Sequence, residues 1–145
     1  VSISNRFSEF SKSMIIKFIM LNHYNYDFAK YIRPRKKFKV ELDQDIDTEI
    51  LMEATTDLNK FDRFIKDVEI SNYNMPVLLK KYLKQNGKII GFNIDPKFNN
   101  ALDGLLILDL FDVPIETISS LSKEINDESI LDRFTMHDIY NIEMK

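Results

Sequence analysis

At 145 residues, 44% of them hydrophobic, the chain is long enough to form one domain with a genuine core, and we expect a single domain over residues 1–145. The absence of cysteine excludes disulfides, thiolate zinc sites and a cysteine nucleophile, and two widely separated histidines argue against an imidazole metal site. The net charge of -3 indicates no general preference for polyanions, and no apolar stretch approaches the length of about 18 residues that crosses a bilayer.

The first elements predicted are two helices. Ser4 or Asn5 can cap a helix that runs to about His23 and carries apolar residues at helical spacing. These apolar residues are Phe7, Phe10, Met14, Phe18 and Leu21. A short second helix is expected between Tyr24 and Ile32, because Pro34 interrupts the pattern.

A basic block follows and then an acidic one. Residues 30–39 hold Lys30, Arg33, Arg35, Lys36, Lys37 and Lys39 without an acid, and residues 41–57 hold seven acids without a base. The simpler interpretation is a solvated loop whose two halves pair with each other. The functional one is a docking surface, centred on Arg33, Arg35, Lys36 and Lys37, for an acyl carrier protein, coenzyme A phosphates or anionic lipid headgroups. Nucleic acid is not expected, because no stacking aromatics are interleaved with these bases.

The second half predicts alternating helices and strands. A helix starts at Thr56 or Asp57, with Leu58, Phe61, Phe64, Ile65 and Val68 on one face. Another starts at Pro76, with Leu78, Leu79, Tyr82 and Leu83 on its apolar face, and ends at Asn86-Gly87. Residues 88–94 and 105–111 are expected to be buried strands, and Val113-Pro114 opens a last helix through Ile115, Ile118 and Leu121. No structure is assigned after Phe134. The fold class is therefore α/β or α+β, with a small mixed sheet flanked by helices.

The loop between the two predicted strands, residues 93–104, places two carboxylates beside an aromatic ring. Asp95 before Pro96 commonly opens a turn, and Asp103-Gly104 commonly closes one. Tyr82 lies on an apolar stripe, where a tyrosine is usually a core residue with its hydroxyl at the rim, although a phenol there can also donate a proton to a thiolate. His23 and His137 have no evident catalytic partner in the sequence.

The order of these residues resembles the C-terminal part of the hemolysin-like, GNAT-related long-chain N-acyltransferases of ornithine- and glycine-lipid synthesis, which are similar to N-acyl amino acid synthases. The residues that carry the resemblance are Pro76, Leu78, Leu79, Lys81, Tyr82-Leu83, Gly87, Asp95-Pro96-Lys97-Phe98, Asp103 and the run 105–110. Residues 1–7 with Ser11-Lys12 resemble a second family element, in which a strand leads through a polar turn into a helix. The helix end departs from the family, because Gln85-Asn86-Gly87 stands where many relatives have Leu-Gly-Ala.

The resemblance implies transfer of a long acyl chain from a thioester on acyl carrier protein or coenzyme A to the amine of a small amino acid. The thioester is a co-substrate, and no permanently bound cofactor is expected. Ile90, Phe92, Leu105 and Ile107 would line the acyl slot, Asp95 or Asp103 would hold the acceptor's ammonium beside Phe98, and Tyr82 would act as the acid.

The resemblance also implies a C-terminal piece of a larger cytoplasmic enzyme, with contact to the inner face of the membrane. The three glycines, Gly87, Gly91 and Gly104, form no phosphate-binding loop. Exposed strand edges in such a piece favour oligomers. The alternative is a non-catalytic docking module for an acidic carrier protein or an anionic membrane surface.

Overall fold

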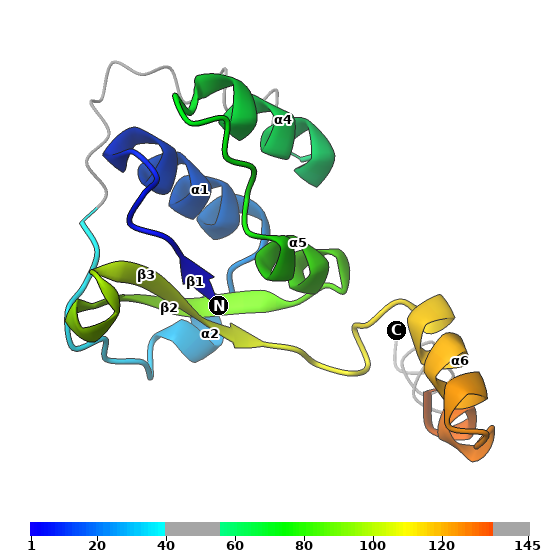
Figure 1. The fold of residues 1–145 in the computed structure, drawn as a ribbon. Helices are drawn as coiled ribbons and strands as arrows, with labels where there is room; N and C mark the ends of the chain where they lie inside the picture. Colours follow the sequence, from blue (N-terminus) through cyan, green and yellow to red (C-terminus); the bar gives the residue numbers. More distant parts are fainter. Residues whose placement is uncertain (40–55, 135–145) are drawn as a thin grey trace.

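The chain folds around a small antiparallel sheet, as a computed structural model of residues 1–39 and 56–134 describes. Strands β1 (Ser2–Ile3), β2 (Lys88–Asp95) and β3 (Ala101–Ile107) form one three-stranded sheet in the order β1-β3-β2. The helices are α1 (Glu9–Asn22), α2 (Tyr26–Ala29), α4 (Leu58–Val68), α5 (Val77–Lys84) and α6 (Ile115–Glu124), with a 3-10 helix at Pro96–Phe98. Figure 1 shows α1, α4 and α5 on one side of the sheet and α2 on the other. The class is α+β.

The three described strands pair in the antiparallel sense, which corrects the expectation of a mixed sheet, and parallel pairing is limited there to an isolated bridge between Tyr24 and Ile89. The connection between β2 and β3 is too short for the crossover that parallel pairing needs. Asn99 and Asn100 both take left-handed backbone conformations, with φ of 53° and 54°, and reverse the chain there. Pairing therefore starts at once, with Asp95 opposite Ala101.

This early reversal moves β3 toward the N-terminus. The strand begins at Ala101 and ends at Ile107, whereas the expected strand covered residues 105–111. Asp103-Gly104 is therefore not a turn, and Asp103 lies within β3 opposite Ser2 and Asn93. The turn at Asp95 is confirmed, because its carboxylate accepts a hydrogen bond of 2.9 Å from the Lys97 amide.

Helix α1 begins later than expected. Its N-cap is Ser8, whose hydroxyl accepts the Ser11 amide, rather than Ser4 or Asn5. The buried carboxylate of Glu69 accepts hydrogen bonds from the Ser8 amide and hydroxyl, at 3.2 and 3.0 Å, and places a negative charge at the positive end of the helix. Two members of the expected apolar stripe, Phe10 and Leu21, are exposed.

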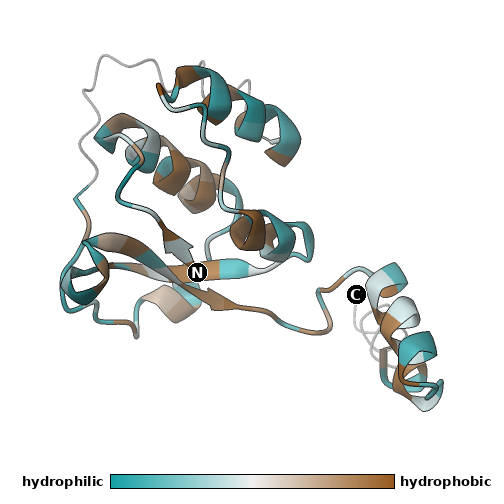
Figure 2. Ribbon diagram, in the orientation of Figure 1, coloured by the Kyte–Doolittle hydropathy of each residue, from teal (hydrophilic) through white to brown (hydrophobic). Residues whose placement is uncertain are grey.

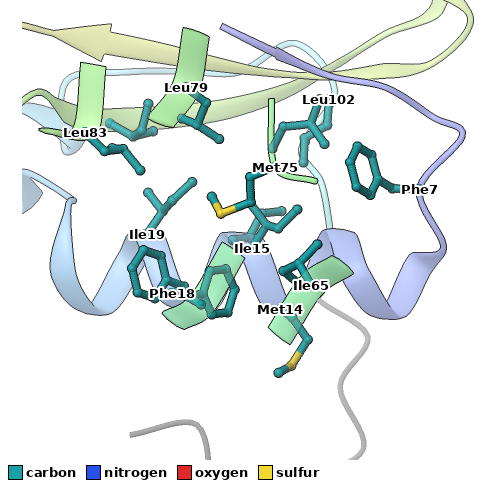
Figure 3. Close-up of a cluster of buried hydrophobic side chains, with 14 residues drawn as sticks. Phe7, Met14, Ile15, Phe18, Ile19, Ile65, Met75, Leu79, Leu83 and Leu102 are labelled. Atoms are coloured by element: carbon teal, nitrogen blue, oxygen red, sulfur yellow. The ribbon is translucent and has the colours of Figure 1, made fainter. Parts of the chain in front are cut away.

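The core lies between the sheet and α1, with α4 and α5 closing it (Figure 3). Phe18 of α1 stacks on Phe61 of α4 with ring centroids 4.1 Å apart and planes within 5°. Figure 3 shows Leu79 and Leu83 entering from α5 and Leu102 from β3. The buried cluster is Ile3, Phe7, Met14, Ile15, Ile16, Phe18, Ile19, Phe61, Ile65, Met75, Leu79, Leu83, Ile89 and Leu102.

The expected position of α5 is confirmed, but only two of the four residues expected on its apolar face are buried. Pro76 is its N-cap, and Asn86, with φ of 62°, supplies the left-handed residue after it. Leu79 and Leu83 are buried, while Leu78 and Tyr82 face solvent. Helix α5 has eight residues, and the apolar face that it buries is narrower than the four-residue face expected from the sequence.

The outer edge of β2 is covered by the chain that follows α1. The Ile89 amide donates to the His23 carbonyl at 2.8 Å, and the Asn25 amide donates to the Ile89 carbonyl at 3.0 Å. Further along, the Ile94 amide donates to the Lys36 carbonyl at 2.8 Å. The loop between these contacts carries α2 and the basic residues Lys30, Arg33 and Arg35, and it is held against the sheet at both ends.

Helix α6 stands apart from the main body in Figure 1, and Figure 2 shows apolar and polar residues alternating along it. Its predicted start is confirmed, with Pro114 as the N-cap. Two hydrogen bonds join this part to the end of α5, from the Asn86 side chain to the Asp112 carbonyl and from Thr117 Oγ1 to Gln85 Oε1, each of 2.7 Å. Within the described ranges, no helix has both the length and the apolar character to cross a membrane.

A buried carboxylate ties α4 to the start of α5. Asp62 accepts hydrogen bonds from the Met75 amide at 2.8 Å, Lys80 Nζ at 2.7 Å and Asn74 Nδ2 at 3.4 Å. Burial raises the pKa of Asp62, but the hydrogen bonds from Lys80 and Met75, with the Lys80 charge, outweigh it and leave the pKa below its ordinary value of 3.8.

We predict that Asp62→Asn lowers the free energy of unfolding at pH 7 by about 1–3 kcal/mol, because the Lys80 ammonium loses its charged partner. The stability that Asp62 adds is complete above pH 3.8 and is lost as pH falls through the lower folded pKa. Urea unfolding between pH 2 and 7 should therefore show a shallower acid limb in the variant. Asp67→Asn, on the exposed side of α4, is the control, and an unchanged acid limb in Asp62→Asn would contradict the assignment.

Candidate functional site

An apolar hollow lies between α1, β2 and the loop that carries the basic block. Its volume is 310 Å³, within the range of about 300–1,000 Å³ that is usual for small-molecule sites. Ile16 and Met20 of α1 form one wall, and Ile90 and Phe92 of β2 form another. The other residues that line this apolar hollow are Tyr24, Ala29, Ile32, Pro34, Lys37, Phe38 and Gly91.

A second hollow, of 460 Å³, lies beside it. Most of its lining surface is also apolar, and we call it the polar hollow only for the charged and amide residues that it includes. Arg33, Arg35, Asn93 and Asp103 are among the residues that line it. The remaining residues that line this polar hollow are Ile32, Pro34, Gly91, Phe92, Gly104 and Leu105. Among the described residues no ion pair joins Asp103 to either arginine, so both signs of charge remain open to a ligand.

The two hollows share a wall made of Ile32, Pro34, Gly91 and Phe92. A Cβ added at Gly91 would stand 2.9 Å from Ile32 Cγ2, so only glycine lets the loop approach β2 this closely. The two hollows are therefore neighbours on either side of the contact between Ile32 and Gly91.

Hydrogen bonds fix the polar hollow. Ser2 Oγ donates to Asp103 across the β1–β3 pair, and the Lys36 amide donates to Asn93 Oδ1 at 2.9 Å. The second contact holds the basic residues next to β2. Asp103 is thereby oriented by strand pairing rather than by a flexible turn.

The predicted docking residues are close together in space. Arg33, Arg35, Lys36 and Lys37 are exposed, and none forms an ion pair within the part of the chain that the structure describes. Most of the acidic block lies in residues 40–55, outside the described residues, so the expected pairing of the two blocks stays a prediction. His137 also lies outside the described residues.

The structure brings some predicted site residues together and leaves others apart. Ile90 and Phe92 line the apolar hollow, and Phe92, Asp103 and Leu105 line the polar one. The members that line neither hollow are Tyr82, Asp95, Phe98 and Ile107. Asp95 is engaged in its turn, Phe98 is 72% exposed, and Tyr82 lies on the solvent side of α5.

Tyr24 is a site residue that the sequence pattern missed. Its ring lines the apolar hollow and stacks near Phe92, with centroids 6.4 Å apart. Burial and the neighbouring Tyr26 raise the pKa of Tyr24 above its ordinary value, so its hydroxyl stays protonated at neutral pH. No other described residue forms a hydrogen bond with that hydroxyl. The position of Tyr24 just after α1 in the sequence did not indicate that it lines a hollow.

His23 lines neither hollow. Burial, with the nearby Lys88 charge, lowers its pKa, and its Nδ1 is buried without a hydrogen-bond partner. Its ring packs on Phe18 with centroids 5.5 Å apart. His23 is therefore a partly buried histidine at the end of α1. In residues 1–39 and 56–134, no group of three or more acidic or histidine side chains is placed to hold a metal ion.

Comparisons with models of known families, with curated proteins and with solved structures found no match to this chain. The resemblance to the N-acyltransferases therefore stays a prediction. The residues offer an apolar hollow for a hydrocarbon and, next to it, a hollow whose lining includes one acidic residue, Asp103, and two arginines, Arg33 and Arg35. The second arrangement is complementary to a zwitterion.

Proposed function

We propose that this chain forms the acyl-chain and acceptor side of an N-acyltransferase that joins a long-chain acyl group to the amine of a small amino acid. The donor is an acyl thioester on acyl carrier protein or coenzyme A. The observation that carries the proposal is the adjacency of the apolar and polar hollows, which share the wall at Gly91.

In this proposal each hollow takes one reactant. The hydrocarbon chain lies against Ile90 and Phe92, where burial of methylene groups provides the affinity. The amino acid lies in the polar hollow, with its ammonium on Asp103 and its carboxylate on Arg33 and Arg35. The basic side chains at the rims attract the acidic carrier.

The chemistry is an aminolysis. The acceptor gives up a proton and its neutral amine attacks the thioester carbonyl carbon; the C–N bond forms, the C–S bond breaks, and the leaving thiolate takes up a proton. An ammonium and a thioester thus become an amide, a thiol and one released proton. The developing oxyanion needs a hydrogen-bond donor, and the protonated hydroxyl of Tyr24 is better placed for that role than Tyr82.

We predict that Met20→Trp, which fills the apolar hollow, weakens binding of a palmitoyl carrier protein by about ten-fold, since several buried methylene contacts are lost. Leu21→Trp is the matched control, because the next residue on α1 is exposed and lines neither hollow. Affinity is measured by native mass spectrometry, with melting temperatures to check the fold. Equal affinities of the two variants would rule out this acyl slot.

We predict that Asp103→Asn raises the KM for the acceptor amine by about ten-fold or more, because the ammonium loses its charged partner. Product is followed by mass spectrometry, with palmitoyl carrier protein and a panel of small amino acids, for this chain and for a longer version with additional N-terminal sequence. Asp95→Asn is the control, since Asp95 lines neither hollow. An unchanged KM in Asp103→Asn would refute the acceptor role, and no product from either protein would refute the proposed activity.

A second candidate function is a non-catalytic docking module for an acidic carrier protein or an anionic membrane. What favours it is the exposure of Arg33, Arg35, Lys36 and Lys37 without ion pairs among the described residues. Both functions use the same surface, and they differ in whether a product forms.

We predict that Lys36→Glu with Lys37→Glu lowers affinity for the acyl carrier protein by about ten-fold at low salt, and that this difference shrinks as salt rises, because attraction between exposed charges is screened. Lys60→Glu with Lys66→Glu on α4 makes the same change in net charge away from the hollows. Equal losses in the two double variants would mean that only net charge matters, and would exclude a local docking surface.

A further inference from the structure

A third hollow, of 260 Å³, lies at the start of α1 and shares only Lys36 with the docking surface described above. We call it the lysine hollow. Polar side chains from separate parts of the chain meet in it: Asn5 and Glu9 before and in the first turn of α1, Lys12 one turn on, Lys36 from the basic block and Asn100 from the turn between β2 and β3.

Lys12 is an unusually buried cation. The residue is only 3% exposed, and its Nζ lies 2.5 Å from Glu9 Oε1 and 2.8 Å from Asn5 Oδ1. The Phe38 ring centroid lies 5.9 Å from Nζ. An ammonium has three hydrogens to donate, and only two of them have acceptors among the described residues.

The position of Lys12 makes this burial costly. It lies near the N-terminus of α1, where the helix dipole is positive and disfavours a cation. The Glu9 side chain that pairs with it is 65% exposed, so solvent screens the attraction. A buried charge with one screened partner destabilises the fold unless another anion approaches.

The other groups in the lysine hollow are also donors. The side chain of Lys36 is exposed and has no ion pair with a described residue. Asn5 accepts from Lys12 through its oxygen, which leaves its NH₂ group to donate elsewhere. The Asn100 side chain forms no hydrogen bond with another described residue. The residues that line the lysine hollow therefore include two lysines and two asparagines but one acid, Glu9.

We propose that the lysine hollow binds a singly charged oxyanion, either a carboxylate or a phosphodiester, held by Lys12 and Lys36 and oriented by the amides of Asn5 and Asn100. The two lysines and Glu9 sum to one positive charge, which a single negative charge neutralises. The oxyanion accepts the third hydrogen of the Lys12 ammonium, so the buried cation gains the partner that Glu9 alone does not provide.

The test is the melting temperature of the chain in sodium acetate or sodium dimethyl phosphate, compared with sodium chloride at the same ionic strength. An ion that binds the folded state raises the melting temperature with its concentration. A rise with acetate alone identifies a carboxylate site, a rise with dimethyl phosphate alone a phosphodiester site, and a rise with both an oxyanion site of either kind. No rise beyond that in chloride overturns the proposal.

Variants locate the effect. Lys12→Met keeps most of the side-chain volume and removes the charge, and we expect it to lower the affinity for the oxyanion by about ten-fold or more. Lys36→Met should weaken it as well, and it remains informative if Lys12→Met does not fold. Lys17→Met, on the same helix but outside the hollow, is the control. The side-chain NH₂ resonances of Asn5 and Asn100 should shift on titration. If the rise persists in Lys12→Met and Lys36→Met, or is equally lost in Lys17→Met, the site is not the lysine hollow.

Discussion

The burial of one face of α1 is the constraint on which the rest of the structure depends. The sheet has only three strands and α4 only one buried stripe, so neither can exclude water without this helix between them. Phe18 reaches α4 through its stack on Phe61, and Ile15 and Ile19 are fully buried in the same core (Figure 3). The capping of α1 by Ser8 and Glu69 fixes where that face begins.

The hollows follow from how the chain leaves α1. Main-chain groups on the outer edge of β2 need partners, and the chain after α1 supplies them at Ile89 and again at Ile94. Between these points the loop bulges away from the strand and touches it where Gly91 admits Ile32. That contact divides the space into an apolar and a polar part, and it carries the basic residues to the rims of both. A basic loop thus becomes the wall of a site because an edge strand must be covered.

Local features were predictable from the sequence where the interaction is itself local. Asp57 as the cap of α4, Pro114 before α6 and the turn at Asp95 each depend on side-chain bonds or backbone angles within a few residues. Predictions failed where distant partners decide. The pairing of Asp103 with Ser2 and Asn93 turned an expected turn into a strand, and the packing of α5 buried Leu79 and Leu83 but left Tyr82 in solvent.

The sequence by itself determined where most of the described helices lie, the basic character of residues 30–39 and the apolar residues that one strand contributes to a hollow, because these depend on composition, periodicity and short-range capping. Only the tertiary structure decided that Asp103 and not Asp95 joins the polar hollow, that Tyr24 and not Tyr82 lines the apolar one, and that Lys12 is buried in a hollow with Lys36. The reason is geometric. A helical or strand period says which residues share a face, but which face meets which neighbour depends on strand register and on where the chain crosses the sheet edge.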